Sequence, residues 1–527
     1  MDRDATLMRS SQPLTGLALQ RRRFVGTSLA MLASACAGTP TSSRPPTAAL
    51  PEHNVELAVG ALDRLVGDLM AHSGVPGMAV AVVRDQRTIY ARGFGTRLVG
   101  TDSPVDADTV FQLASVSKSV GATVVAHEVG AGRVRWDSRI RDILPWFALK
   151  DPSVTEQLTI GDLYAHRSGL PDHAGDRLED MGYDQRVVLE RLRYLPLASF
   201  RKSYAYTNFG LTAGGVAAAT AAGLDWAALS ERAIYAPLGM ARTSSRFHDY
   251  ESRSNRAIGH RQVSGTWQRA QPPRMPDAQA PAASVTSSVN DMAKWLAMVM
   301  GHGVYQGRRI VEPEALASAL SQQCEISPAH EGRPASYYGY GFNVGRTLAG
   351  RVAYSHSGAF ETGAATAFKM VPETGLAIIA LTNGYPLGVP EILQQQFFDL
   401  VEHGAVQKDW GALIRPYFVK MNAPEGSLVG VARPLSSRPP SALSDYAGIY
   451  RNDYHGPLTI SMTNGSLIAT LGATPLRLRL THWDADTYTF TLDNENAAPG
   501  TLSKATFAPG RVTLEYYDEE GLGTFVR

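Results

Sequence analysis

Strand-like segments stand at both ends of a long, mainly helical stretch, and this order limits the folds that the chain can adopt. Helices and loops are predicted over residues 130–250, between the strands. Strands so far apart in the sequence must meet in one sheet, which predicts an α+β domain: an antiparallel sheet flanked by helices, with an all-helical lobe. The predicted strands cover residues 78–83, 88–91, 352–356, 364–370 and 375–381.

Two helices are predicted at the ends of this domain, which spans residues 55–402. The first covers 55–69, where the apolar residues recur at helical spacing, and the last covers 391–401. Asp85-Gln86 predicts a hairpin turn between the first two strands. Gly93-Phe94-Gly95 is a poor dinucleotide-binding match because no helix follows it, so a turn is predicted there.

The pattern changes after a connector at residues 403–440, which ends in a run rich in proline, serine and arginine. Residues 441–527 alternate polar and apolar side chains, and Asn464-Gly465 is a strong hairpin signal. A small C-terminal all-β domain with a barrel-like sheet is therefore predicted. Its expected strands are 458–462, 466–471, 476–480, 487–491 and 512–516.

The N-terminus predicts export. Residues 1–35 hold a basic cluster, Arg21-Arg22-Arg23, and then an apolar run too short to span a membrane comfortably. The cluster resembles a twin-arginine signal, which directs a folded protein to the periplasm or cell envelope. Two outcomes stay open: cleavage after Ala35, or lipidation of Cys36 as a membrane tether, with the usual leucine one place too early. Residues 36–54 are a Pro/Ser/Thr-rich linker.

Charge and cysteine content exclude several classes of function. The 527-residue chain has a net charge of +1, so no nucleic-acid partner is expected. Cys36 and Cys324 are its two cysteines, too few for a disulfide framework or a cysteine metal site. The chain also lacks the GxSxG elbow of α/β-hydrolases and the HExxH zinc motif. We expect neither metal nor cofactor.

The first chemical motif is Ser115 with Lys118. These residues share one face of a helix predicted to begin near Ser115 and to stop at Gly130. Serine needs a base beside it to act as a nucleophile, and lysine serves only when burial or nearby positive charge favours its neutral form. The positive end of the helix dipole would also stabilise an oxyanion beside Ser115.

Two further motifs follow in the chain. Tyr206 and Asn208 are two residues apart in a predicted extended loop, so their side chains are expected to point the same way. The phenol could move protons, and the amide could hold the substrate carbonyl or Lys118. His356, Ser357 and Gly358 end a predicted strand. There Gly358 would admit substrate backbone, and the amide of Ala359 would be the second oxyanion donor. His356 would assist proton transfer or, when charged, bind a substrate carboxylate.

With these motifs in this order, the sequence resembles the serine β-lactamase-like family, which includes class C β-lactamases, DD-carboxypeptidases, D-aminopeptidases and related esterases. Three further stretches carry the resemblance. They are residues 158–171 (LTIGDLYAHRSGLP), 236–240 (APLGM) and 281–284 (PAAS), the last before a helix at 291–296. The C-terminal β domain resembles an accessory domain that follows some of these hydrolases, and two roles stay open for it: shaping the cleft or acting as a spacer.

The resemblance implies Ser115 as nucleophile, Lys118 and Tyr206 as the proton-transfer pair, and Asn208 as partner of the substrate carbonyl. His356 stands where lactamases carry the lysine of K-T-G, which favours the aminopeptidase and esterase branches. The sequence therefore predicts an exported serine hydrolase that forms an acyl-enzyme on a small ester, amide or D-residue peptide. A β-lactamase and a non-catalytic penicillin- or peptidoglycan-binding protein are the alternatives. Specificity is expected from cleft loops at 170–200, 245–280 and 325–345; the oligomeric state is not predicted.

Overall fold

The computed structural model describes residues 50–330 and 334–527. The predicted export signal at 1–35 and Cys36 lie outside these residues, as does most of the linker. Helix α2 (Glu52–Gly60) begins inside the stretch predicted as linker. The single predicted helix at 55–69 is two helices in the structure, because the chain breaks at Ala61 before α3 (Leu62–Ser73).

One antiparallel sheet organises the main domain, as predicted, and joins the early and late strands in the order β2-β1-β14-β13-β12-β11-β10-β9. β1 pairs with β14 over its whole length, from Met78 opposite Thr382 to Arg84 opposite Leu376. The strands are β1 (Gly77–Arg84), β2 (Arg87–Gly95), β9 (Cys324–Ser327), β10 (Ser336–Tyr338), β11 (Asn343–Arg346), β12 (Val352–Phe360), β13 (Ala364–Val371) and β14 (Leu376–Thr382).

The predicted hairpin is confirmed, with Asp85 and Gln86 at φ 47° and 63°. The predicted turn at Gly93-Phe94-Gly95 is wrong. β2 continues through these residues, and Gly93 pairs with Ala79. The glycines are needed for close packing: a Cβ on Gly93 would lie 2.4 Å from the carbonyl oxygen of Val105.

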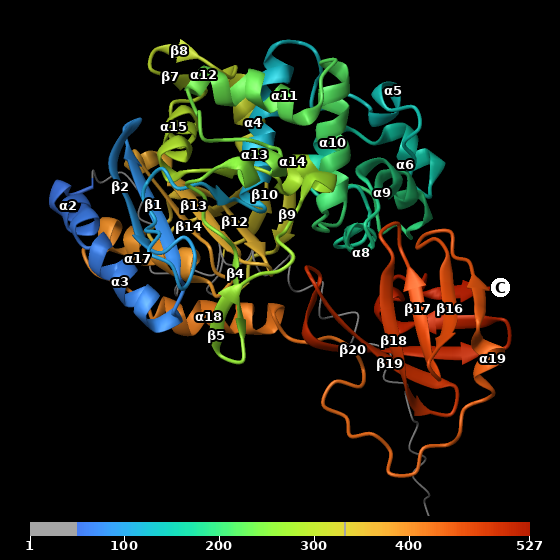
Figure 1. Ribbon diagram of the computed structural model, residues 1–527. Helices are drawn as coiled ribbons and strands as arrows, with labels where there is room; N and C mark the ends of the chain where they lie inside the picture. Colours follow the sequence, from blue (N-terminus) through green and yellow to red (C-terminus); the bar gives the residue numbers. More distant parts are fainter. Residues whose placement is uncertain (1–49, 331–333) are drawn as a thin grey trace, which may run out of the picture.

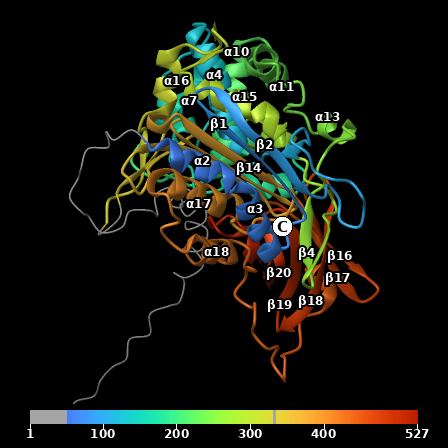
Figure 2. The ribbon, with the colours of Figure 1, turned by 90° about the vertical axis from the view of Figure 1, so that its left-hand side faces the viewer.

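Alternate residues of β1 serve two separate cores. Met78, Val80 and Val82 pack with helices α2, α3, α17 (Val389–His403) and α18 (Trp410–Met421) on one face. Ala79, Ala81 and Val83 belong to the larger core on the other face, with α4 (Val116–Gly130) and α15 (Val289–Met300). All six side chains are fully buried. Figure 2 shows α2, α3 and α17 together on one side of the sheet.

A helical lobe lies between β2 and β9 in the chain and sits beside the sheet (Figure 1). Its remaining helices are α5 (Ile140–Ile143), α6 (Pro152–Gln157), α7 (Ile160–Tyr164), α8 (Asp176–Asp180), α9 (Gln185–Arg191), α10 (Asn208–Ala221), α11 (Trp226–Ser230), α12 (Ala236–Leu238), α13 (Phe247–Ser252), α14 (Ala280–Ala283) and α16 (Pro313–Leu320). Two-stranded pairs join β3 (Phe111–Gln112) to β6 (Thr286–Ser287), β4 (His260–Val263) to β5 (Thr266–Arg269), and β7 (Val304–Tyr305) to β8 (Arg308–Arg309).

The C-terminal part is an eight-stranded meander with its strands in sequence order, which confirms the predicted barrel-like sheet. Its two ends meet: Arg451, just after β15, exchanges backbone hydrogen bonds of 2.7 and 3.0 Å with Val526 of β22. The elements are α19 (Leu443–Tyr446), β15 (Gly448–Tyr450), β16 (Leu458–Thr463), β17 (Ser466–Leu471), β18 (Leu476–Asp484), β19 (Thr487–Asn494), β20 (Ala497–Ala508), β21 (Arg511–Leu514) and β22 (Thr524–Val526). The predictions missed β15, β20 and β22.

The barrel docks against the helical lobe. Tyr183 donates a hydrogen bond of 2.9 Å to the carbonyl of His455, and the Gly175 amide donates one of 3.2 Å to the hydroxyl of Tyr454. The hairpin formed by β19 and β20 reaches from the barrel toward the main domain (Figure 1). Throughout the part of the chain that the structure describes, every helix is too short or too polar to cross a lipid bilayer.

Helix α18 lies inside the stretch that was predicted to be only a connector. It packs beneath the sheet through Trp410, whose indole nitrogen donates a hydrogen bond of 2.7 Å to Asp399 of α17. Helical spacing here is weakened by Pro416 within the helix, which explains why the sequence did not reveal it.

We expect Trp410→Ala to lower the free energy of unfolding by about 3–5 kcal/mol, because it leaves a cavity and removes one of the hydrogen bonds to the buried Asp399 carboxylate. Val419→Ala on the same helix, at a side chain that is 71% exposed, should change it by less than about 0.5 kcal/mol. Chemical denaturation followed by circular dichroism measures both. Equal effects of the two substitutions would mean that α18 does not stabilise the domain.

Candidate active site

Ser115 stands at a sharp turn between a short strand and the buried helix α4. β3 pairs with β6, and the Leu113 amide donates a hydrogen bond of 2.9 Å to the carbonyl of Val285. Ala114 then adopts φ 46°, a left-handed conformation that is strained for a residue with a Cβ. The helix begins at Val116, as the sequence predicted, so the Ser115 hydroxyl lies at its N-terminus.

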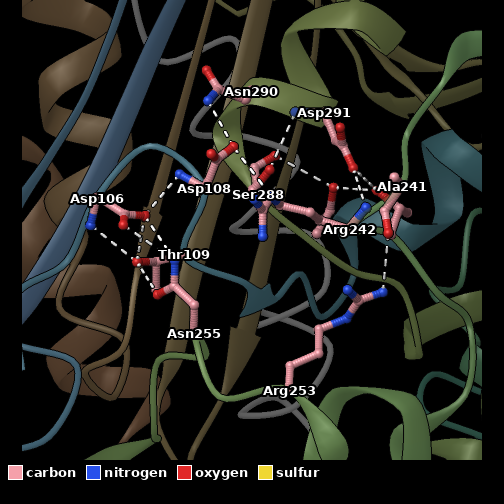
Figure 3. Close-up of polar contacts among 12 residues, drawn as sticks. Asp106, Asp108, Thr109, Ala241, Arg242, Arg253, Asn255, Ser288, Asn290 and Asp291 are labelled. Atoms are coloured by element: carbon pink, nitrogen blue, oxygen red, sulfur yellow. Dashed lines mark hydrogen bonds and ion pairs between the residues drawn. The ribbon is translucent and has the colours of Figure 1, made fainter.

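The segment before this turn is fixed by polar contacts between loops that are distant in the sequence (Figure 3). Thr109 donates a hydrogen bond of 2.9 Å to the side-chain oxygen of Asn255. Asp108 accepts one of 2.8 Å from Asn290 and forms an ion pair of 3.3 Å with Arg242. These contacts hold the strand that leads to Ser115 against the helical lobe.

Lys118 lies one helical turn beyond Ser115 and is completely buried. Its ammonium nitrogen contacts Ser115 Oγ at 3.0 Å, Asn208 Oδ1 at 2.6 Å and the carbonyl oxygen of Ala282 at 3.2 Å. Burial lowers the pKa of Lys118 to about 7, although the negative charge of Asp176 acts in the opposite direction. A substantial neutral fraction at neutral pH is what proton acceptance requires.

Tyr206 and Asn208 both reach Lys118, as predicted, but not from an extended loop. Asn208 is the first residue of α10, and Tyr206 precedes the N-cap. The ring of Tyr206 lies under the Lys118 nitrogen at 4.6 Å from its centroid. Burial raises the pKa of Tyr206, opposed in part by a hydrogen bond with Ser115, so the phenol keeps its proton at neutral pH.

Asp176 and His173 are a part of the site that the sequence analysis missed. Asp176 Oδ2 accepts a hydrogen bond of 2.8 Å from Asn208 Nδ2 and forms a second one, also of 2.8 Å, with His173 Nδ1. A chain of contacts thus runs from His173 through Asp176 and Asn208 to Lys118. The two residues lie in the predicted cleft loop 170–200, but nothing in their spacing distinguishes them from the other polar residues there.

Strand β12 passes beside Ser115 and continues to Phe360, so the predicted motif lies inside the strand rather than at its end. Gly358 makes the close approach possible. A Cβ at this position would lie 2.2 Å from the Leu113 carbonyl oxygen and 2.9 Å from the Ser115 amide nitrogen. No larger residue fits between these backbones.

His356 is buried and both ring nitrogens are engaged. Nδ1 lies 2.7 Å from the carbonyl oxygen of Ser357, and Nε2 lies 2.8 Å from the hydroxyl of Tyr338. A carbonyl only accepts, so Nδ1 carries the proton and Nε2 accepts from the phenol. Burial, and next the charge of Lys118, lower the pKa of His356 to about 3. A neutral imidazole disfavours the alternative in which a charged His356 binds a substrate carboxylate.

These groups open onto one cleft with a volume of about 180 Å³. All three predicted regions contribute, through His173 and Asp176, Arg274 and Gln279, and Asn343. The third, predicted as a loop, holds strand β10 and the start of β11, to which Asn343 belongs. Residues that follow the main domain in the chain also line the cleft: Glu425, Glu495, Asn496 and Ala498. The C-terminal barrel therefore shapes the cleft, which decides between the two roles left open by the sequence. Within the described residues, no group of three or more His, Cys, Asp or Glu side chains is placed to hold a metal ion.

A profile of the Beta-lactamase family matches residues 62–396, well over half of the chain. The chain belongs to this family. Residues 432–521 match DUF3471, a domain of unknown function. An octameric penicillin-binding protein homologue from Pyrococcus abyssi has the same fold, with a TM-score of 0.57 at 19% identity over 89% of this chain and all of that one.

The family match, with hydrolases among the relatives, identifies the chain as a serine hydrolase whose exact reaction is not specified. Unguisins hydrolase ungD of Aspergillus violaceofuscus is 25% identical over 82% of this chain and 83% of its own. Penicillin-binding protein 4 of Amycolatopsis lactamdurans is 29% identical over 59% and 81%. The D-alanyl-D-alanine-carboxypeptidase/endopeptidase AmpH of Escherichia coli is 24% identical over 57% and 76%.

We expect Gly358→Ala to slow acylation of Ser115 by at least about a hundredfold, because the new methyl group must displace the Ser115 amide. Gly67→Ala in α3 is the matched control, since a Cβ there meets nothing within 4 Å. The rate of labelling by a fluorophosphonate probe measures the effect. Labelling of Gly358→Ala at the control rate would show that β12 does not constrain Ser115.

Proposed function

We propose that Ser115 is the nucleophile of a hydrolase that forms an acyl-enzyme on esters or on peptides containing D-residues. The observation that carries the proposal is the 3.0 Å contact between Ser115 Oγ and a completely buried Lys118, whose pKa is lowered to about 7. Neutral Lys118 takes the hydroxyl proton as Ser115 attacks the substrate carbonyl. The acyl–oxygen or acyl–nitrogen bond then breaks, and Tyr206 passes a proton to the leaving group. Water hydrolyses the ester on Ser115 and restores the enzyme.

The oxyanion of the tetrahedral intermediate is proposed to lie between the amides of Ser115 and Ala359. The close approach of Gly358 to the Ser115 nitrogen brings the two segments together. The N-terminus of α4 adds a favourable dipole at the same point. Asn208 is proposed to hold Lys118 in place through its 2.6 Å contact and to meet the substrate carbonyl.

Two other functions stay open for the same site: a β-lactamase, and a penicillin- or peptidoglycan-binding protein that turns over little or nothing. Penicillin-binding protein 4 supports the second by its name, whereas AmpH and ungD support hydrolysis. His356 favours a peptide or ester hydrolase over a β-lactamase, because a neutral imidazole replaces the cationic lysine of K-T-G. We further propose export to the cell envelope, on the basis of Arg21-Arg22-Arg23 and the apolar run after it.

Ser115→Ala is expected to abolish turnover of p-nitrophenyl acetate and to leave the thermal transition nearly unchanged, because only the hydroxyl is lost. Intact-protein mass after mixing with a penicillin, and separately with the ester, shows which reagent acylates the wild type. A stable penicillin adduct without turnover would favour the binding protein. Turnover retained in Ser115→Ala would refute the mechanism.

The pH dependence of kcat/KM reports the protonation state of Lys118. Because only the neutral amine accepts a proton, we expect kcat/KM to rise with pH and to level off above about 7. Asp176 stabilises the charged amine, so Asp176→Asn should move this limb to lower pH. A limb that stays in place would remove Asp176 from the set of residues that tune Lys118.

A further inference from the structure

We propose that the β19–β20 hairpin of the C-terminal barrel and Glu361 at the end of β12 form an anionic subsite that binds an ammonium group of the substrate. This inference rests on the proposed function, since it concerns the substrate of the same cleft. The subsite consists of Glu361 and Glu495, and Asp176 lines the same cleft.

The hairpin is built into the wall of the cleft. Glu495 Oε1 accepts a hydrogen bond of 3.0 Å from the Glu361 amide, and its Oε2 accepts one of 3.0 Å from the Thr362 hydroxyl. Asn496, the next residue, donates a hydrogen bond of 3.3 Å to the carbonyl of Asp176. The hairpin tip thus joins the end of β12 to helix α8. Asp176 of this helix contacts Asn208, which in turn contacts Lys118.

Acidic groups outnumber basic ones on the cleft wall. Asp176, Glu361, Glu425 and Glu495 line it, against Arg274. Arg274 is already paired with Glu179 at 2.6 Å, and Arg261, the basic group that acts on Glu361, is paired with Asp493 at 2.6 Å. Across residues 50–330 and 334–527, no ion pair or hydrogen bond is made by the Glu361 carboxylate.

Buried acceptors without donors give an independent reason to expect a cationic ligand. Asp176 is 1% exposed and Asn343 is 5% exposed, and both line the cleft. Asp176 Oδ1 and Asn343 Oδ1 lack a hydrogen-bond donor within the described chain. A buried acceptor left unpaired is costly, and an ammonium group supplies three donors as well as the missing positive charge.

The protonation of Glu361 depends on what the subsite holds. Burial, and next the charge of Glu495, raise its pKa to about 8. A bound ammonium group would offset both effects and favour the carboxylate. Two residues of extended chain, about 7 Å, separate Glu361 from the proposed oxyanion donor Ala359. The substrate cation is therefore expected within about 7 Å of the scissile carbonyl.

The test compares ester substrates that differ only in an ammonium group. The methyl esters of D-alanine and β-alanine are paired with methyl 2-methylpropanoate and methyl butanoate, in which a methyl group replaces the ammonium. In at least one pair, wild-type kcat/KM for methanol release should favour the ammonium ester by at least about tenfold. Glu361→Gln and Glu495→Gln should each reduce that ratio by about tenfold, whereas Asp445→Asn should keep it within about twofold.

Asp445→Asn is the matched control because it removes the same charge from an exposed residue of the same barrel that neither lines the cleft nor acts on Glu361. Glu361→Gln breaks no side-chain hydrogen bond, so it tests the subsite even if Glu495→Gln loosens the hairpin; thermal transitions check both. The subsite would be overturned by a wild-type ratio of kcat/KM near one in both ester pairs, or by a ratio that neither glutamine variant changes. In either case, ester turnover that depends on Ser115 would leave the proposed function standing. Turnover of every ester, p-nitrophenyl acetate included, at the Ser115→Ala rate would overturn both.

Discussion

The burial of one amine beside one hydroxyl is the constraint on which the site depends. Lys118 is completely enclosed, and its ammonium nitrogen has three oxygen neighbours, from Ser115, Asn208 and Ala282. A charged amine in such a place is costly, so the protein both lowers its pKa and keeps a carboxylate, Asp176, one amide away. The large core around α4 and the helical lobe is what keeps water from Lys118.

The chemistry is assembled at the junction of the lobe and the sheet. Ser115 and Lys118 come from α4, Tyr206 and Asn208 from the start of α10, and Gly358 from β12. Each element is fixed by a different core or polar network, including the contacts of Asp108 and Thr109 before the strained turn at Ala114. The geometry at Ser115 is thus held by the whole domain, and a strained conformation persists there because its surroundings determine it.

The C-terminal barrel is part of this arrangement rather than an independent appendage. Its closed meander leaves few free edges, and it docks through Tyr454 and His455 onto the lobe. From that position the β19–β20 hairpin caps the end of β12 with Glu495. A barrel in this position changes the lining of the cleft without disturbing the elements that hold Ser115 and Lys118.

The sequence by itself determined the order of the elements and the positions of the motifs. Periodicity located five of the eight strands of the main sheet (β1, β2, β12, β13 and β14), helix α4 and the barrel, and the i, i+3 spacing placed Ser115 beside Lys118, because these signals are local. It missed β9, β10 and β11. It missed α18, where Pro416 interrupts the pattern. It also ended β2 too early, because it predicted a turn at Gly93 where the strand continues. It also left His356 free to be charged, since no local pattern reveals the phenol of Tyr338 and the carbonyl that engage its nitrogens.

Only the tertiary structure decided which distant groups share the cleft. Asp176, Glu361 and Glu495 are far apart in the chain, and no spacing rule connects them. Their meeting depends on how the barrel docks on the lobe, and burial there raises the pKa of Glu361 and of Glu495. Local sequence fixes what each side chain is able to do, whereas burial and neighbours, which arise from packing across the whole molecule, fix what it does here.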